Sequence, residues 1–578
     1  PQGILPLVDA LIEKNGNIRG QQYELLESLV QHYENRLPNS ICISEYDKWY
    51  SLYESAVDLP VKTLSSAFVL IIVSPTEGDL SRTLSSLIQQ EHSDWVAWVD
   101  GDIPAAFEDE QRIQKRPVKP NLSDLYASEI NLVTFIESGD HLSINAFSKI
   151  VQLFLNNTKT CIIYSDCDHD DSEGKRVDPW FKPAWDPDLF LSQNYIHHLC
   201  VINASLIQAL PLNMHALPWL AVQAAIELQL DIMHCPYVLY HRRYKAYESE
   251  NNIKLSLQCA QDYLQVFEPA ATINLHPFNS ELRKIHRPIP ERPPLISLII
   301  PTKDQAELLK SCVESIEQRS TYRNFELIII DNQTSDDDAL VLLEQLQSRG
   351  HKVIRYDKTF NYSAINNFAV GHANGDIIGL INNDVEVITE TWLEEMLSLL
   401  LRPGVGTVGA KLQWPNGMVQ HGGVLLGVNN LAGHIGNENM SDHLGYYGGL
   451  QITHRVGAVT AACLLTRKSD YLKYHGLNEN AFPVAFNDVD YCLKLSQAGL
   501  ASVWTPFACL IHAESISRGK DDIPQKAARA QMEMTQLRQR WTKVLMSDRY
   551  YHPSLSLSSA NAPFSALAIP PRNRQARL

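Results

Sequence analysis

Two stretches of the chain alternate short apolar runs with segments of helical spacing, in the same order. The first stretch opens with Phe68–Ser74 and continues, after a helical pattern, with Trp95–Asp100. The second opens with Ile296–Pro301 and continues, after a similar pattern, with Phe325–Asp331. Short runs that are apolar throughout are typical of parallel strands buried on both faces. The repeat, offset by roughly 230 residues, predicts a duplicated α/β domain.

The second copy continues with further strands and helices in alternation. We expect helices at 306–318, 337–349, 363–373, 389–401 and 488–497, and strands at 352–356, 377–381, 405–411, 456–466, 502–504 and 508–511. The strand at 377–381 runs directly into Asn382, Asn383 and Asp384. Open α/β sheets bind ligands at the carboxyl ends of their strands, so this tripeptide is well placed for a site.

Composition shifts set the expected domain boundaries. Residues 1–60 have helical spacing and predict an N-terminal helical segment, and 61–285 form the first α/β domain. Residues 286–294 hold four prolines, which predict a linker because proline interrupts helices and central strands. Residues 295–520 form the second α/β domain, and 521–578 predict a C-terminal helix followed by an extended tail.

Composition and charge limit the classes of function. The chain is 45% hydrophobic and 20% charged, as in globular proteins, and its net charge of -17 argues against nucleic acid as a partner. The ten cysteines include no CxxC pair, and no apolar run approaches the roughly 18 residues of a membrane span. We therefore expect reduced thiols in a cytoplasmic protein, with only peripheral association with membranes.

Candidate site residues of the second copy lie at strand ends or helix starts. Asp331 and Asp384 end strands, Asp488 opens a helix, and His512 ends the last strand. Each could instead cap a helix or begin a turn, so their shared placement at one edge of a sheet supports the prediction more than any one of them. A carboxylate there offers the hard oxygen ligand that Mg²⁺ or Mn²⁺ prefers.

Six motifs follow in order along the second copy. They are Ser297–Lys303, Ile329–Asn332, Phe360–Asn367, Leu380–Glu386, Ala485–Leu493 and His512–Arg518. This set resembles the family 2 glycosyltransferases with the GT-A fold, a Rossmann-like nucleotide-diphospho-sugar transferase fold. It is most similar to large bacterial members, including rhamnosyltransferase-type enzymes, that build O-antigen, capsule and other surface glycans.

The resemblance implies a divalent metal ion and a nucleotide-sugar donor, UDP- or dTDP-linked. Asn382, Asn383 and Asp384 occupy the position of the family's DxD motif at the donor, with Asp384 as a ligand of Mg²⁺ or Mn²⁺. Asn382 replaces the first acid and carries no charge, so the metal needs a further ligand. His512 matches the family's terminal metal-binding histidine and would supply it.

The resemblance also implies inversion at the sugar carbon and roles for three further residues. Thr302 and Asp331 match positions that contact the nucleotide, and Asp488 matches the general base, although Asn487 precedes it where many members have Glu. Asp490 is expected to support the site. The acceptor would be a glycan or a lipid-linked oligosaccharide, which would bring the chain to the inner face of the plasma membrane.

The glycine-rich stretch 415–449 is a candidate pocket for the donor sugar and the acceptor. Trp414, His421, His434 and the pair Tyr446–Tyr447 supply aromatic rings that can stack on sugar faces. A surface lid with aromatic residues in its hinge is an equally good interpretation of this stretch.

The first copy resembles the same family in a degenerate form. Tyr164–Asp168 and Phe181–Asn194 match segments of two-domain members, and Val238–His241 echoes the strand that ends at His512. The metal motif, however, is replaced by Glu137–Asp140, and Trp219–Glu227 is an apolar helix where the catalytic acid is expected. We predict a domain that binds or supports and does not catalyse.

Two other functions stay open. The protein could be a bifunctional enzyme with a sugar-transfer site in each domain, or a non-catalytic assembly protein that binds nucleotides or glycans. Nucleotidyl transfer is disfavoured, because neither first loop has the glycine-rich, basic sequence that holds a triphosphate.

Overall fold

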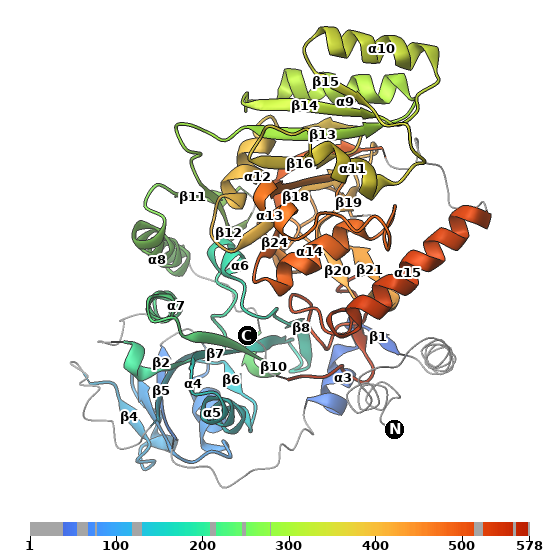
Figure 1. Cartoon of the computed structure of the whole chain (residues 1–578). Helices are drawn as coiled ribbons and strands as arrows, with labels where there is room; N and C mark the ends of the chain where they lie inside the picture. The colour runs from blue at the N-terminus through green and yellow to red at the C-terminus, as the bar shows by residue number, and fades with distance from the viewer. Residues whose placement is uncertain are drawn as a thin grey trace. The chain divides into compact units, whose positions relative to one another are not determined.

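The computed structural model describes residues 39–54, 67–74, 78–117, 130–207, 215–244, 250–277, 279–437, 439–513, 524–558 and 562–575 (Figure 1). The helices expected within residues 1–38 lie outside these ranges. The chain divides into two compact units. Unit 1 consists of Pro1–Trp185, Tyr195–Cys259 and Tyr551–Leu578, and unit 2 consists of Asp186–Asn194 and Ala260–Tyr550.

Unit 2 is built on a mixed, mainly parallel sheet with the strand order β15-β14-β13-β16-β23-β18-β24-β17. The strands are β13 (Ile296–Thr302), β14 (Phe325–Asp331), β15 (Lys352–Arg355), β16 (Ile377–Ile381), β17 (Val385–Val387), β18 (Val405–Gln413), β23 (Cys463–Arg467) and β24 (Ala501–His512). β23 and β17 run antiparallel to their neighbours. The short strands β19 (Val419–His421) and β22 (His454–Val456) pair with β18 and β24. Outside this sheet, β11 (Thr272–His276) pairs with β12 (Asn279–His286), and β20 (Val424–Leu426) pairs with β21 (Ala432–His434).

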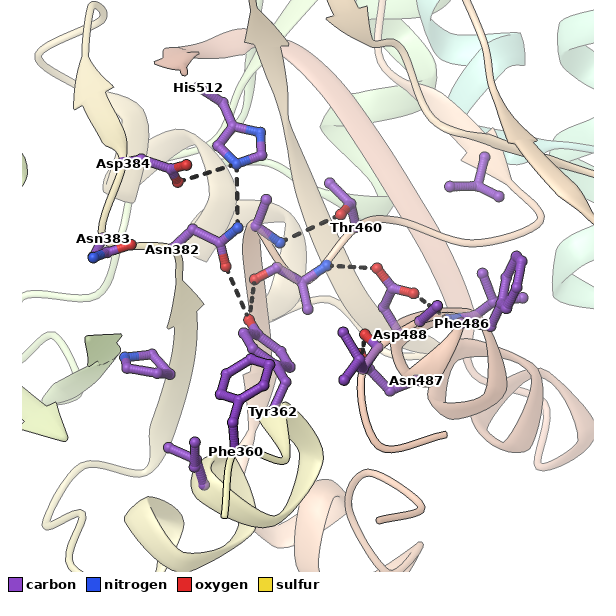
Figure 2. A pocket seen from close by; sticks show the side chains of 18 of the residues that line it. Phe360, Tyr362, Asn382, Asn383, Asp384, Thr460, Phe486, Asn487, Asp488 and His512 are labelled. Atoms are coloured by element: carbon purple, nitrogen blue, oxygen red, sulfur yellow. Dashed lines mark hydrogen bonds and ion pairs between the residues drawn. The ribbon is translucent and has the colours of Figure 1, made fainter. Parts of the chain in front are cut away.

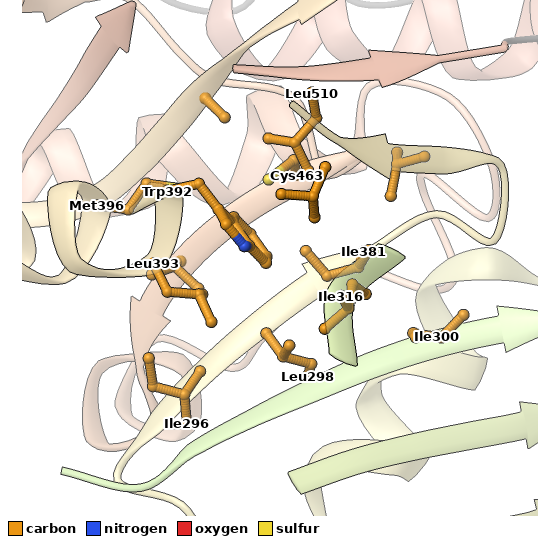
Figure 3. Packing of buried hydrophobic residues seen from close by; sticks show 14 of the residues in the cluster. Ile296, Leu298, Ile300, Ile316, Ile381, Trp392, Leu393, Met396, Cys463 and Leu510 are labelled. Atoms are coloured by element: carbon orange, nitrogen blue, oxygen red, sulfur yellow. The ribbon is translucent and has the colours of Figure 1, made fainter. Parts of the chain in front are cut away.

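Helices cover both faces of this sheet, which explains why its central strands are apolar throughout. The helices are α9 (Ala306–Arg319), α10 (Asp337–Ser348), α11 (Tyr362–Val370), α12 (Trp392–Leu400), α13 (Lys468–Lys473) and α14 (Asn487–Gln497). Alternate residues of β13 point to opposite faces: Leu298 packs with Ile316 of α9 and Trp392 of α12, as Figure 3 shows. Ile299 packs on the other face with residues of α11 and α14. Two buried layers therefore hold the strand ends, and the loops that follow them, in fixed positions.

Two sequence expectations in unit 2 are wrong in detail. The expected strand 456–466 is interrupted, because β22 ends at Val456 and β23 begins at Cys463. The intervening residues leave the sheet, and Thr460 to Ala462 line a cavity. The two expected final strands are one strand, β24, which tolerates Pro506 because its pairing with β18 shifts register between Ala410 and Lys411.

Unit 1 has a second sheet whose strand order, β4-β3-β2-β5-β9-β7-β10-β6, matches that of unit 2 strand for strand. The strands are β2 (Ala67–Ser74), β3 (Trp95–Val99), β4 (Ile113–Lys115), β5 (Ile130–Glu137), β6 (His141–Leu142), β7 (Thr160–Asp170), β9 (Cys200–Asn203) and β10 (Asp231–Arg242). β8 (Arg176–Trp180) pairs with β7 at the side. The helices of this unit include α3 (Tyr46–Tyr53), α4 (Leu80–Ile88), α5 (Ala146–Asn156) and α7 (Leu217–Glu227). The predicted tandem α/β fold is confirmed.

Residues after 550 complete unit 1. β25 (Ala566–Ala568) pairs with β1 (Ser40–Cys42), and Leu555 and Leu567 are fully buried. The indole nitrogen of Trp49 donates to the carbonyl oxygen of Ala568 at 2.9 Å. The expected C-terminal helix is present as α15 (Pro524–Leu545), and part of the extended tail that follows it belongs to a packed core.

All ten cysteines lie in the described part of the chain as free thiols, eight of them buried. Among the described helices, none combines the length and the apolar character needed to cross a bilayer.

Candidate active site

A cavity of about 620 Å³ opens in unit 2 at the carboxyl ends of β13, β16 and β24 and the start of α14. Six of the seven predicted site residues line it, as Figure 2 shows for most of them: Thr302, Asn382, Asn383, Asp384, Asp488 and His512. The sheet brings these residues together although more than 200 positions of sequence separate Thr302 from His512.

Asp384 and His512 face each other across the pairing of β17 with β24. Asp384 immediately precedes Val385, which is the register partner of His512. The Nε2 atom of His512 lies 3.2 Å from the Oδ1 atom of Asp384, and the two residues are only about 6% exposed.

Gln420, the middle residue of β19, determines which nitrogen of His512 carries the proton. Its Oε1 atom lies 2.6 Å from Nδ1 of His512, and its amide group lies 3.4 Å from the carbonyl oxygen of the same residue. A carboxamide oxygen only accepts, so Nδ1 is the donor. In the neutral ring, Nε2 is therefore the nitrogen without a proton, and its lone pair can accept a hydrogen bond or bind a metal ion.

The arrangement fits a divalent cation. The Oδ1 atom of Asp384 is buried and has no hydrogen-bond partner, and Nε2 of His512, which also accepts from the Asn382 amide, lies 3.2 Å from it. Two acceptor atoms at this distance repel each other unless a cation or a proton lies between them. Buried polar groups without partners are rare, so this pair of atoms is chemically suited to share a metal ion.

The two asparagines of the tripeptide hold its conformation. The Asn383 side chain donates to the Thr302 hydroxyl at 3.1 Å. The Asn382 amide lies 3.1 Å from Nε2 of His512, and its carbonyl oxygen accepts from the Tyr362 hydroxyl at 3.2 Å. Asn382 thus orients His512. An acidic residue at this position would have added a second negative charge beside Asp384.

Asp488 lies in the first turn of α14 and lines the cavity from another side (Figure 2). The backbone N–H groups of Ala461 and Val489 donate to its two carboxylate oxygens at 3.0 and 2.8 Å. The side chain is half-buried, so its remaining lone pairs are open to a ligand in the cavity.

Helix α15 contributes residues that the motifs do not indicate. Lys526 and Arg529 line the cavity together with Lys303, so three cations surround it. Glu533 is fully buried and accepts from the N–H groups of Val484 and Ala485 at 2.6 and 2.9 Å, which fixes the loop that leads to Asp488.

Asp490 has the supporting position that the sequence predicts. It is fully buried, and its Oδ1 atom accepts from Trp541 and Arg540 of α15, each at 2.9 Å.

Asp331 is the predicted site residue that does not line the cavity. Its carboxylate accepts from the backbone N–H of Thr334 at 2.8 Å and from Arg355 at 2.6 Å, and it is 5% exposed. Its neighbour Asn332 lines the cavity instead.

The glycine-rich stretch reaches the cavity with part of its length. Gln420, Gly433 and His434 line it, whereas Trp414 and the pair Tyr446–Tyr447 are absent from the lining. His421 lies behind His434, with their Nδ1 atoms 2.8 Å apart. Burial and the nearby His434 hold the pKa of His421 well below its usual value.

The corresponding place in unit 1 is closed by internal bonds. Asp140 precedes His141, the register partner of His241, just as Asp384 precedes the partner of His512. Asp140 accepts from the Tyr240 hydroxyl and the Arg243 backbone, each at 2.8 Å, and Arg243 also donates to Glu137 at 2.9 Å. An arginine thus lies where unit 2 has its facing pair.

Two further features separate unit 1 from unit 2. His241 turns away from Asp140 and bonds to Asp168 through Nδ1 at 2.6 Å. Helix α7, the counterpart of α14, has no acidic residue in its first turn.

Known proteins are similar to this chain over most of its length. It is 34% identical over 526 residues to the uncharacterized protein y4gI of Sinorhizobium fredii, covering 85% of this chain and 57% of that protein. It is 29% identical over 569 residues to the O-antigen biosynthesis protein RfbC of Myxococcus xanthus, covering 91% of this chain and 43% of that protein. The chain spans about half the length of these curated relatives.

Two solved structures have a weak similarity to this chain. They are the mannosyltransferase PcManGT from Pyrobaculum calidifontis in complex with GDP-Man and Mn²⁺ (13% identity, TM-score 0.33, 51% of this chain and 81% of that chain) and GalNAc-T7 with UDP, GalNAc and Mn²⁺ (12% identity, TM-score 0.34, 44% and 50%). The model of the glycosyl transferase family 2 matches residues 297–458, which run from β13 to the turn after β22. Unit 2 thus holds the part of the chain that is similar to glycosyltransferase family 2.

Proposed function

We propose that unit 2 is an inverting, metal-dependent glycosyltransferase that moves a sugar from a nucleotide-sugar donor to a hydroxyl group of a surface-glycan precursor. The observation that supports this most is the meeting of six predicted residues at one cavity, with Asp384 facing a lone pair of His512 and Asp488 on another side.

Asp488 is the general base of the proposed reaction. An acceptor hydroxyl is a weak nucleophile, and a carboxylate within hydrogen-bond reach can remove its proton as it attacks the sugar carbon. The backbone bonds from Ala461 and Val489 hold this carboxylate in place. A single base is sufficient for attack from the face opposite the leaving group, which inverts the sugar carbon.

Asp384 and His512 would hold the Mg²⁺ or Mn²⁺ ion, and Asn382 would orient His512. Such an ion takes up negative charge that develops on the diphosphate as the sugar leaves. Lys303, Lys526 and Arg529 add positive charge to the same cavity and would help to bind the diphosphate.

Thr302 and Asn383 are the proposed contacts to the nucleotide, and their mutual hydrogen bond fixes both side chains. Asp331 is the further proposed contact to the nucleoside. Its carboxylate is paired with the Arg355 guanidinium, which we expect to move when the nucleotide sugar binds. A UDP- or dTDP-linked sugar is the proposed donor.

We place the acceptor among bacterial surface glycans, including a lipid-linked oligosaccharide at the inner face of the plasma membrane. The similarity to an O-antigen biosynthesis protein and the surface-glycan motifs support this choice. The family 2 match supports transfer of a sugar but leaves open whether it is rhamnose or another hexose.

The closed site of unit 1 favours one active site over two. Arg243 already supplies the positive charge at Glu137 and Asp140, and burial together with the Glu137 charge raises the pKa of Asp140 to about 6. No acid opens α7. At the described positions that correspond to Asp384 and Asp488, unit 1 therefore has neither an unpaired carboxylate nor a base.

A screen of nucleotide sugars for metal-dependent donor hydrolysis tests the proposal. We expect one donor class to be hydrolysed with Mn²⁺ or Mg²⁺, Asp384→Asn to abolish the turnover, and Asp140→Asn, its counterpart in unit 1, to leave it unchanged. Loss of only one of two transfer activities in Asp140→Asn would instead indicate a bifunctional enzyme. Binding of donor and metal without turnover would indicate a non-catalytic assembly protein.

A further inference from the structure

Unit 1 contains a cluster of metal-ligating side chains that the proposed reaction does not use. It consists of Glu137, His197 and His198, whose ligand atoms all lie within 4.8 Å of one another. Glu137 is the last residue of β5, and the two histidines precede β9. The antiparallel pairing of Thr134 with Val201, continued by three residues, places Glu137 opposite His198.

The imidazole groups of this cluster lack hydrogen-bond partners. Both ring nitrogens of His197 and the Nε2 atom of His198 are buried and unpartnered. The two residues are only 8% and 4% exposed, so they have little contact with bulk solvent. Each such buried group costs about 1–3 kcal/mol, and a metal ion would remove part of this cost by taking the one lone pair that each neutral ring carries.

We propose that Glu137, His197 and His198 bind one Zn²⁺ ion in unit 1. Two histidines and one carboxylate are a common set of protein ligands for zinc, with a fourth position left for water. In a tetrahedral site, ligand atoms about 2.0–2.2 Å from the ion are about 3.3–3.6 Å apart, so these side chains would move closer together when they bind the ion.

Neighbouring side chains orient these ligands. Arg243 donates to Oε2 of Glu137 at 2.9 Å, and the ring of His215 stacks on His197 with centroids 4.4 Å apart. The arginine also reduces the negative charge of the site. Most of the binding must then come from imidazole, which favours zinc over magnesium.

A second cluster of similar composition in unit 1, Asp166 with His234 and His552, is explained without a metal. The backbone N–H of Ser554 donates to Nδ1 of His552 at 3.0 Å, so a neutral ring carries its proton on Nε2. That nitrogen lies 2.7 Å from Asp166, and His234 lies 2.8 Å from the other oxygen of the same carboxylate. In the Asp166 cluster one ring nitrogen of each histidine lies within 2.8 Å of a carboxylate oxygen, whereas both ring nitrogens of His197 are without a hydrogen-bond partner.

The bound ion would join the end of β5 to the segment before β9. In unit 2 the corresponding end of the sheet carries the proposed catalytic metal pair, so the two units would use the same edge for different ions. The role of the zinc is the stability of unit 1 and not the transfer of sugar.

Titration of the full chain with Co²⁺, as a spectroscopic probe of zinc sites, tests this proposal. The Asp384→Asn variant is the starting protein, because it removes the proposed metal site of unit 2. We expect one equivalent of Co²⁺ to bind with visible d–d absorption, to be displaced by Zn²⁺, and Zn²⁺ to raise the temperature of unfolding. Unit 1 carries no substitution in this protein. Absence of stoichiometric Co²⁺ uptake would therefore overturn the proposal.

Substitutions in the same background locate the ion. His197→Gln should weaken Co²⁺ binding by more than about 10-fold, because even the loss of an outer hydrogen bond to a ligand costs that much. His92→Gln is the matched control, since His92 is also a buried histidine of unit 1 but bonds to the carbonyl oxygen of Ala67. Equal Co²⁺ affinity in the two variants would place the ion elsewhere and contradict the assignment.

Discussion

The protonation of His512 depends on Gln420, a residue that lies outside the six sequence motifs. Because Gln420 accepts the Nδ1 proton, the Nε2 lone pair of His512 faces Asp384. Strand ends in the sequence predict the positions of Asp384 and His512, since a parallel sheet collects its carboxyl ends at one edge. Gln420 and the capture of Asp331 by Arg355 are not predictable in this way, because both depend on how loops fold back on the sheet.

Replacement of Gln420 should weaken metal binding more than it lowers turnover at saturating metal. In Gln420→Leu the ring of His512 can rotate or change tautomer, so the Mn²⁺ concentration for half-maximal donor turnover should rise about 10–100-fold, with turnover at saturating metal largely preserved. Gln420→Glu keeps an acceptor for Nδ1 and should rescue the metal dependence. An unchanged metal dependence in Gln420→Leu would show that Gln420 does not position His512.

Asp140 should make the free energy of unfolding fall as the pH rises, whereas a carboxylate in an exposed salt bridge makes it fall as the pH drops. Burial raises its pKa to about 6 from an unfolded value near 3.8, so the folded chain keeps a proton that the unfolded chain releases. Stability is therefore lost as the pH rises from about 4 to about 6, by up to about 3 kcal/mol. The difference in unfolding free energy between Asp140→Asn and wild type, measured across that range, should shift in favour of the variant as the pH rises. A difference that does not vary with pH would contradict this.

Helix α15 links the end of unit 2 to its candidate catalytic loop. Glu533 holds Val484 and Ala485, and Trp541 holds Asp490, so one helix fixes both sides of the turn that presents Asp488. The sequence predicts this helix from its apolar spacing. The spacing shows which face is buried but not what the face contacts, so the cations that α15 adds to the cavity are visible only in the structure.

Loss of the Glu533 carboxylate should loosen the loop before Asp488. Glu533→Ala leaves two backbone N–H groups without an acceptor and should lower the unfolding free energy of unit 2 by about 2 kcal/mol or more. Turnover should fall more than donor affinity, because the base is displaced while Thr302 and Asn383 stay in place. Glu533→Gln retains a carbonyl acceptor and should lie between this variant and wild type. Equal losses in both properties would contradict a positioning role.

At the scale of the whole chain, duplication explains most of the architecture. The same strand order occurs twice, and the sequence predicts it because both copies begin with the same apolar strands and helix. The membership of residues 551–578 in unit 1 is not predictable, because β1 and β25 are short and their pairing joins positions more than 500 residues apart. The last residues of the chain therefore complete a domain that the first half begins.

His552 should be important for unit 1 and unimportant for transfer. It is one of two histidines bonded to the fully buried carboxylate of Asp166. His552→Ala leaves this charge partly uncompensated and should lower the unfolding free energy of unit 1 by about 3–5 kcal/mol, as for other broken buried pairs. Thermal unfolding and donor turnover, measured on the same preparation, should show a lower first transition with turnover preserved at low temperature. A stability equal to that of wild type would show that the tail does not anchor through Asp166.

The most direct test of the proposed active site is the transfer rate of Asp488→Asn with the donor identified by the screen. The variant keeps the size of the side chain and one acceptor oxygen but removes the base. Transfer should fall by about 10²–10⁴-fold, while binding of the nucleotide with Mn²⁺ stays at the wild-type level. Transfer that is undiminished in Asp488→Asn would show that unit 2 does not use this carboxylate as its base and would contradict the proposed mechanism.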